Sequence, residues 1–288
     1  MGTTLRLIGS VFKLRIAAAI TLCALGGVAV TPGAVPEAYQ IAALGLAVML
    51  SAASAGAFNQ YVERDLDGRM RRTAGRPFVT GQLRAGPLWL GVILATLALA
   101  IGLAALALNS WVALHTFLGA FVYGVVYTVW LKRRTWLNIV LGGLAGSFAV
   151  LAGAATVDPR PTAAPILLAV VLFLWTPPHF WSLAAAVRDD YARAGVPMLP
   201  VVVGDALAAK IIFAHSVTLV LLSLIPGFIS LGWVYLISAA VGGAFFVVKS
   251  WRLVQELSAK AAITNFFASL VQLSLMLTGA IADRLLLG

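Results

Sequence analysis

The sequence predicts a polytopic all-α membrane protein, and three observations lead to this fold class. Of the 288 residues, 61% are hydrophobic and only 10% are charged, whereas a soluble domain carries roughly 25% charged residues. The mean hydropathy is +1.00. Apolar runs of about 20 residues, the length of a membrane-spanning helix, recur along the whole chain. We therefore expect residues 1–288 to form a single integral-membrane domain.

Nine apolar runs are long enough to span a bilayer as helices. In chain order they cover residues 12–31, 38–58, 88–108, 111–131, 138–157, 165–187, 211–229, 233–248 and 265–283. Alternate connections are short and rich in turn-forming residues, and the others are longer and charged. Pro177 and Pro178 lie inside the sixth run, where we expect them to kink or interrupt the helix just before His179. The fifth run contains several glycines, which indicate tight helix packing.

The distribution of the basic residues predicts the orientation of the chain. All but two of the 20 Lys and Arg residues lie at the N-terminus or in the longer connections, and the exceptions are Arg160 and Arg284. By the positive-inside rule the N-terminus is cytoplasmic and the C-terminus is outside. The net charge of +10 therefore reflects topology rather than nucleic-acid binding. The single cysteine, Cys23, lies in the first run, and we interpret it as a buried small hydrophobic residue.

Residues 59–77 form the most informative segment, because they place a dense group of charges directly after an apolar run. Asn59, Glu63 and Asp67 lie at i, i+4 and i+8, which is one face of a helix. Mg²⁺ is usually held by one or two carboxylates together with substrate phosphates. Five arginines lie nearby, at positions 64, 69, 71, 72 and 76. The segment therefore predicts a site for a magnesium-bound polyphosphate, with Asp65 as a further candidate.

A second acidic segment follows the sixth run and contains Arg188, Asp189 and Asp190. Alone, such a pair of aspartates is usually a solvated loop. Together with the first segment it can complete a second magnesium site. The two segments lie four helices apart, which hints at a duplicated four-helix unit.

The other polar residues of the membrane region have two interpretations each. The basic group 132–134 is either a stop-transfer anchor or a means of neutralising a leaving diphosphate. We expect His115 and His215 to be packed, hydrogen-bonded residues. His179 is placed to face the predicted site, so a ligand-binding role and a packing role stay equally open.

Three long motifs in the same order carry a resemblance to a known family. The first is 59–77, and the second is 127–146, which includes Lys-Arg-Arg-Thr and three glycines. The third is 175–200, which begins Trp-Thr-Pro-Pro-His-Phe-Trp and ends at a proline. Over roughly residues 10–285 the chain resembles the protohaem IX farnesyltransferases, or haem O synthases, which are UbiA-type intramembrane prenyltransferases.

The resemblance implies nine helices around a central cavity and the Mg²⁺-dependent transfer of a farnesyl group from farnesyl diphosphate to a vinyl group of haem B. It implies a bacterial inner (plasma) membrane location, and a haem A synthase or other oxidase-assembly protein is an open partner. The metal set that we expect is Asn59, Glu63, Asp67, Asp189 and Asp190. The catalytic set is Asn59, Glu63, Asp67, Lys132 and Arg133. The substrate-binding set is Arg64, Asp65, Arg72, Arg76, Tyr127, His179, Arg188 and Tyr191.

Two departures from the wider superfamily bear on the acceptor. Glu63 stands at the middle position of the first motif, where an Asp is usual, and His179 stands where quinone-type relatives carry an Asp. Both favour haem over a phenolic acceptor, although a quinone-precursor polyprenyltransferase is the nearest alternative. A transporter is the alternative from another class. It should place ionisable groups near the bilayer midplane, and only His215 looks markedly interior.

Overall fold

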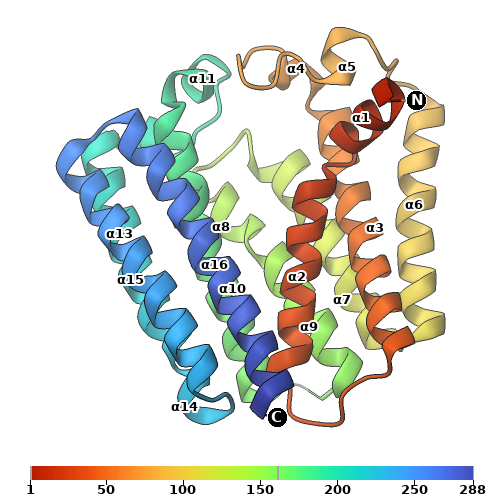
Figure 1. Cartoon of the computed structure of the whole chain (residues 1–288). Helices are drawn as coiled ribbons and strands as arrows, with labels where there is room; N and C mark the ends of the chain where they lie inside the picture. The colour runs from red at the N-terminus through yellow and green to blue at the C-terminus, as the bar shows by residue number, and fades with distance from the viewer. Residues whose placement is uncertain (1, 161, 288) are drawn as a thin grey trace.

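The computed structural model describes residues 2–160 and 162–287, and the nine expected spans are all present as helices (Figure 1). In the described part of the chain, eight spans are long and apolar enough to cross a membrane, and the ninth, α2, has 17 residues. The spans are α2 (Leu14–Val30), α3 (Ala38–Val62), α6 (Pro87–Ala107), α7 (Ser110–Phe121) continued by the π-helix η1 (Val122–Leu131), α8 (Asn138–Gly142) with α9 (Leu144–Val157), α10 (Ala163–Ala186), α13 (Asp205–Leu224), α15 (Trp233–Glu256) and α16 (Ala259–Leu287).

Short helices lie at the ends of the bundle. They are α1 (Gly2–Val11), α4 (Arg64–Asp67), α5 (Pro77–Thr80), α11 (Arg188–Arg193), α12 (Leu199–Val203) and α14 (Pro226–Ile229). Helices α1, α4, α5 and α11 gather at the end of the molecule where the chain begins, and α14 lies at the end where it finishes (Figure 1). The two acidic segments therefore lie at one end, as expected for segments that follow the second and the sixth spans.

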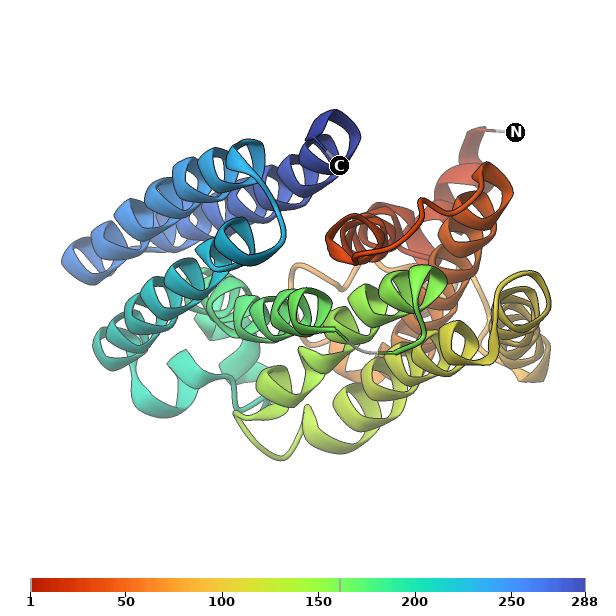
Figure 2. The ribbon, with the colours of Figure 1, turned by 90° about the horizontal axis from the view of Figure 1, so that it is seen from below.

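The spans divide into two groups of four, with α2 between them (Figure 2). Helices α3, α6, α7 and α9 pack together, as do α10, α13, α15 and α16, and α2 contacts α3, α9 and α16. Each group begins with a helix that runs into a short acidic helix, α4 or α11. This arrangement agrees with the hint of a duplicated four-helix unit.

Glycines allow α2 and α9 to approach closely, as the glycine content of the fifth run indicates. A Cβ atom added at Gly153 would overlap the carbonyl oxygen of Ala24, and one added at Gly27 would overlap that of Val150. Because lipid tails are as apolar as leucine, helices in a bilayer associate through such close backbone packing. This crossing fixes α2 against the rest of the bundle.

The double proline does not interrupt the sixth span, so the expected interruption is wrong, while the alternative, a kink, stays a prediction. Helix α10 continues through Pro177 and Pro178 to Ala186. Proline at 177 leaves the Phe173 carbonyl without its usual helical donor, and this carbonyl lies against Gly143, where an added Cβ would be 3.0 Å away. A break occurs instead in the neighbouring span, between α8 and α9, at Gly143, which packs closely against α10.

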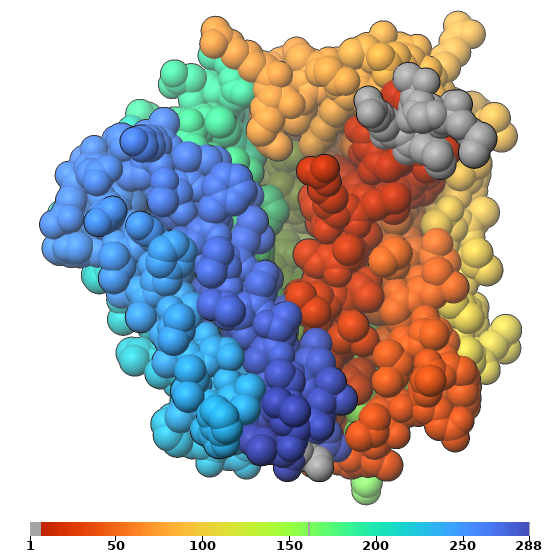
Figure 3. Space-filling model, in the orientation of Figure 1, coloured from red at the N-terminus to blue at the C-terminus, as the bar shows by residue number. Residues whose placement is uncertain are grey.

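One face of the molecule is hollowed between the first and last spans. In the space-filling view, the surface sinks between α2 and α16, and atoms of the green helices behind them are visible (Figure 3). Ile16 and Arg15 of α2 and Phe266 and Leu270 of α16 line the cavity that lies inside this opening.

Candidate active site

Asn59, Glu63 and Asp67 form a row, and their helical i, i+4 spacing continues past the end of α3. Helix α3 ends at Val62, yet the Glu63 N–H donates to the Asn59 carbonyl at 2.9 Å and the Asp67 N–H donates to the Glu63 carbonyl at 2.7 Å. The i, i+4 spacing is therefore kept across the joint between α3 and α4. All three side chains are at most 2% exposed, so the row is an interior feature and not a solvated loop.

Each member of this row contacts one cation. The Lys13 ammonium donates to Asn59 Oδ1 at 2.6 Å, Lys132 donates to Glu63 Oε2 at 2.5 Å, and Arg76 donates to Asp67 Oδ2 at 2.6 Å. Lys132 is itself 7% exposed. Buried ions are retained only when they are paired, so the three contacts explain how the acids are tolerated here.

Lys13 was missed as a site residue by sequence reasoning, where it counted only as a topology charge. It lies before α2 with φ 47° and ψ 45°, a left-handed conformation that is rare outside glycine. Its ammonium also donates to the Tyr123 hydroxyl at 3.2 Å. Burial lowers the pKa of the Lys13 ammonium to about 7. A basic residue before a first span is too common a feature to have pointed to this role.

The π-helix η1 brings further polar groups to the row. Thr128 accepts a hydrogen bond from Asn59 Nδ2 at 3.0 Å and donates to the Tyr123 carbonyl at 2.8 Å. Tyr127 is buried, stacks on Tyr123 with ring centroids 5.5 Å apart, and has the Lys132 ammonium 5.5 Å from its ring centroid. π-Helical turns are frequent at functional sites because they re-aim side chains.

The donor set of the row fits a hard divalent cation. Glu63 Oε1 and Asp67 Oδ1 are buried and have no hydrogen-bond partner among the described residues. Mg²⁺ needs few protein ligands when substrate phosphates complete its shell. Two free carboxylate oxygens beside the Asn59 amide therefore supply what such a site requires.

Asp65 and Arg133 form a separate pair outside the row. Arg133 donates twice to the Asp65 carboxylate, at 2.8 and 2.9 Å, and both side chains are about half exposed. This hydrogen-bonded guanidinium lowers the pKa of the Asp65 carboxyl. Arg64 donates to the Tyr61 carbonyl at 2.6 Å and is exposed. These contacts brace the surface of the site and leave the predicted catalytic and binding roles of the three residues untested.

The second acidic segment contributes one residue to the neighbourhood of the first. Asp190 is buried, pairs with Arg193, and accepts a hydrogen bond from the Arg72 backbone N–H at 3.4 Å. Tyr191 is buried beside it. This contact joins α11 to the loop after α4, so the structure brings together the two segments that the sequence paired.

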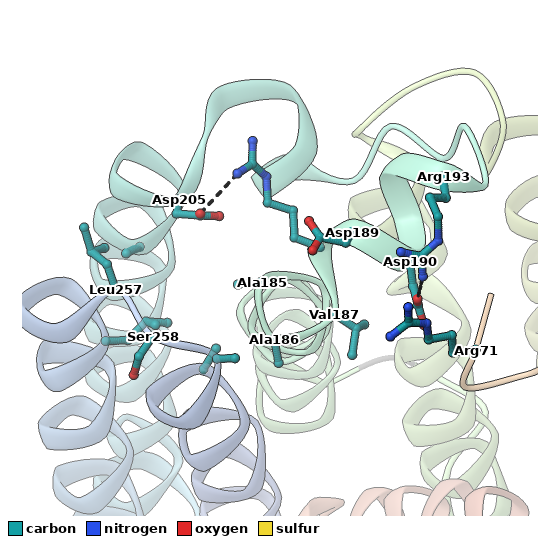
Figure 4. Close-up of a pocket in the computed structure, with 15 residues that line it drawn as sticks. Arg71, Ala185, Ala186, Val187, Asp189, Asp190, Arg193, Asp205, Leu257 and Ser258 are labelled. Carbon is teal, nitrogen blue, oxygen red and sulfur yellow. Dashed lines mark hydrogen bonds and ion pairs between the residues drawn. The ribbon is translucent and has the colours of Figure 1, made fainter.

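Asp189 and Arg188 are more exposed than Asp190. Asp189 is exposed, and Arg188 pairs with Asp205 at 3.2 Å. With Asp190 they line a surface cleft of about 510 Å³ between α10, α13 and the start of α16 (Figure 4). Within the described residues no group of three or more His, Cys, Asp or Glu side chains is placed to hold a metal ion. The five predicted ligands are thus not gathered into one cluster.

A cavity of about 500 Å³ extends into the membrane region from this end. It is lined by α2, α3, α7 and η1, α8 and α9, α10 and α16, and mainly by apolar side chains. Lys13, Tyr123 and Arg72 line it near the acidic row, and Lys13 connects it to Asn59. Arg72 is thus among the residues that line the cavity, and its predicted substrate-binding role stays a prediction.

His179 lies in this cavity between two aromatic rings. Its ring stacks on Trp175 and Phe266 with centroids 4.2 and 4.3 Å away, and its Nδ1 is 2.7 Å from Ser269 Oγ. The Ser269 hydroxyl also lies 2.7 Å from the Phe266 carbonyl. When the hydroxyl donates to that carbonyl, its oxygen accepts from His179 Nδ1–H, and Nε2 keeps its lone pair. Sequence reasoning missed Ser269, because a lone serine in an apolar run carries no signal.

The other two histidines differ from each other. His215 lies outside the cavity and meets the edge of the Trp181 ring, in agreement with the packing role that we expected. His115 lines the cavity and stacks on Phe148, and its Nδ1 is buried without a partner in the described structure. The expectation that it is hydrogen-bonded is therefore wrong for Nδ1.

The fold of this membrane bundle, with a buried acidic row at the mouth of an apolar cavity, is also found in solved structures. The fold matches a digeranylgeranylglyceryl phosphate synthase with a TM-score of 0.78 and 15% identity, covering 97% of this chain and 98% of the other. It matches a UbiA homologue from Archaeoglobus fulgidus bound to DMAPP and Mg²⁺ with a TM-score of 0.73 and 16% identity, covering 97% and 99%. At these identities the likeness concerns the fold alone.

Sequence similarity identifies the family of the chain and a group within that family. The chain belongs to the UbiA prenyltransferase family, whose model matches residues 20–271, and within it to the protohaem IX farnesyltransferases. It is 57% identical to protohaem IX farnesyltransferase 2 of Paramagnetospirillum magneticum over the full length of both chains. It is 38% identical to the protohaem IX farnesyltransferase of Azoarcus sp., covering 95% of this chain and 92% of the relative.

Proposed function

We propose that this protein transfers the farnesyl group of farnesyl diphosphate to a vinyl group of haem B and so produces haem O. The allylic C–O bond breaks, and its electron pair leaves with the diphosphate. The vinyl π electrons form the new carbon–carbon bond, and water adds to the resulting cation and loses a proton. The observation that carries this proposal is the buried row of Asn59, Glu63 and Asp67, with its three cations, at the mouth of an apolar cavity.

The residues that would hold Mg²⁺ are Asn59, Glu63 and Asp67, because two of their carboxylate oxygens are buried and unpaired. When bound, the ion would neutralise charge that develops on the diphosphate. Asp190 is the nearest acid of the second segment, through its contact with the Arg72 backbone. Asp189 would not bind this metal ion, because it lines the surface cleft and is exposed.

The chain's own cations stabilise the leaving group. Lys13, Lys132 and Arg76 lie within hydrogen-bond distance of the acidic row, and Arg72 lines the cavity. Positive groups fixed in a water-poor site stabilise negative charge that grows in the transition state. Arg133 is committed to Asp65, so its role is to hold α4 in place beside Lys132.

His179 is the residue that we assign to the haem acceptor. Its Nε2 carries a lone pair in the tautomer that Ser269 fixes, and histidines that bind a metal commonly donate their other ring N–H to such a partner. A phenolic acceptor would not need this arrangement. Trp175 and Phe266 stack on the two faces of the His179 ring, so only the edge of the ring is left for contact with a substrate.

The chain is an integral membrane protein. We place it in the bacterial inner membrane with the N-terminus and the acidic row at the cytoplasmic face, because nearly all Lys and Arg residues lie at that end. A haem A synthase or another oxidase-assembly protein, which would consume haem O, is the partner that this function suggests. Cysteine substitutions in the end loops, labelled from either side of intact membranes, test the orientation.

The test of the reaction is product formation by the purified protein with haem B, farnesyl diphosphate and Mg²⁺. Mass spectrometry should show haem that has gained a farnesyl group and one water. Asn59→Ala, Asp67→Ala and a chelator should each abolish it, whereas Asp158→Asn, an acidic residue at the opposite end, should not. Prenylation of an added phenolic acceptor in place of haem would move the protein to the quinone branch.

Ser269→Ala tests the role of His179 without removing the imidazole. Loss of the accepting oxygen frees the tautomer, so haem affinity should fall about 10- to 100-fold, the range for such supporting hydrogen bonds. The haem absorption spectrum should shift, and binding of farnesyl diphosphate should stay unchanged. An equal loss of both affinities would contradict the assignment of His179 to the acceptor.

A further inference from the structure

The cavity ends on one side chain from each of the six spans that line it. On every helix we take the lining residue that lies farthest along the chain from the acidic row. These residues form the cavity floor, which consists of Cys23, Val48, His115, Ala149, Leu172 and Leu273. Because the helices alternate in direction, this set comes from six unrelated places in the sequence.

The helices give the depth of the cavity between the acidic row and the floor. Along α3, Val48 lies eleven residues before Asn59, which is about 16 Å at the helical rise of 1.5 Å per residue. Along α2, Cys23 lies ten residues after Lys13, or about 15 Å. Two helices that run in opposite directions therefore give the same depth.

We propose that the cavity floor sets the length of the isoprenoid that the enzyme accepts, a proposal that rests on the proposed function. At roughly 1.25 Å per carbon–carbon bond, an extended farnesyl chain is about 14 Å long and a geranylgeranyl chain about 19 Å. With the diphosphate at the acidic row, the farnesyl chain reaches the floor and a fourth isoprene unit does not fit. A geranyl chain, about 9 Å long, leaves the lower part of the cavity unfilled.

The floor is firm enough to act as a stop. Cys23, Val48, Ala149, Leu172 and Leu273 are all at most 6% exposed and belong to the main hydrophobic core. Protein interiors are close-packed, so admitting an extra isoprene unit would force side chains or helices apart.

His115 closes the floor from α7. Its ring stacks on Phe148 with centroids 6.0 Å apart and an interplanar angle of 26°. Its Nδ1 is buried and has no hydrogen-bond partner among the described residues, and a hydrocarbon tail would not supply one.

The opening between α2 and α16 offers the chain a different route (Figure 3). Ile16, which is 58% exposed, lines the cavity on that side. A chain that left through this opening would extend into lipid, and the floor would then have no influence on its length. The two routes predict opposite effects for substitutions at the floor and at the opening.

The experiment compares geranyl, farnesyl and geranylgeranyl diphosphates on the full-length protein in detergent. We measure the mass and rate of the haem product and, separately, the shift in melting temperature that each diphosphate causes. The unmodified protein should prefer farnesyl over geranylgeranyl diphosphate about 10-fold or more, the scale on which apolar pockets reject excess methylenes. Leu172→Ala should raise the geranylgeranyl-to-farnesyl ratio about 10-fold, and Ala149→Leu should move the preference to geranyl.

The controls separate the outcomes. Leu114→Ala alters the lipid-facing side of α7, next to His115, and should leave the ratio unchanged. Leu273→Ala replaces Leu172→Ala if that variant does not fold. Unchanged ratios in the floor variants, with a changed ratio in Ile16→Trp, would overturn the proposal. If no haem product forms but the melting shifts follow the expected order, the proposed reaction fails and the role of the floor stands.

Discussion

Substitutions at Lys132 and Glu63 can separate the contribution of this buried ion pair to stability from its contribution to catalysis. Their charged atoms are 2.5 Å apart, and both side chains are less than 10% exposed. Removing one partner leaves an unpaired buried charge, which costs about 3–5 kcal/mol. We expect Lys132→Met and Glu63→Gln each to lower the free energy of unfolding by this amount, or the melting temperature by roughly 6–10 °C. The double variant leaves neither charge of this pair unpaired, so most of the loss should be recovered.

The assay is a double-mutant cycle on the purified protein, with unfolding and product formation measured on the same samples. The double variant should be stable and still inactive, because both residues are placed at the diphosphate. Additive losses of stability would refute the buried pair. Full activity in the stable double variant would refute the assigned roles of both side chains.

Three further predictions concern other parts of the molecule. Arg133 lowers the pKa of the Asp65 carboxyl. The pair therefore stabilises the fold above the unfolded-state pKa near 3.9, and this stabilisation is lost as the pH falls through the lower folded-state pKa. Because the pair is half exposed, Asp65→Asn should reduce the pH-dependent part of the unfolding free energy by less than about 1 kcal/mol. Gly153→Ala should lower the melting temperature by pushing α9 away from Ala24, whereas Gly102→Ala, with open space around it, should not. Chelation of Mg²⁺ should reduce farnesyl diphosphate binding in titrations and leave haem binding intact.

Much of the fold could be predicted because a membrane span is recognisable from the hydropathy of its own residues. The apolar runs reproduce all nine spans, since a backbone in lipid must satisfy its hydrogen bonds within a helix. The placement of Lys and Arg residues puts both acidic segments at one end, where the structure has them. The i, i+4 spacing of Asn59, Glu63 and Asp67 also survives, because the backbone hydrogen bonds continue across the end of α3.

The family is also readable from the sequence, because its motifs are long and contiguous. Residues 59–77 and 175–200 carry enough fixed positions to identify it before any coordinates are known. Adjacent residues in a motif can nevertheless differ in burial: Asp190 is buried and Asp189 is exposed, although both line the same cleft. The contact of Asp190 with the loop after α4 depends on the packing of α11 against that loop.

The composition, the apolar runs and the motifs by themselves determined the fold class, the topology and the chemistry expected at one end of the bundle. Only the tertiary structure decided which cation meets which acid and that α10 passes unbroken through two prolines. It also decided that Ser269 lies within hydrogen-bond distance of His179 and that six distant residues line one cavity. The physical reason is range. Hydropathy and helical spacing act within a few turns of one helix, whereas ion pairs, hydrogen bonds and cavity walls form between helices whose packing no single segment encodes.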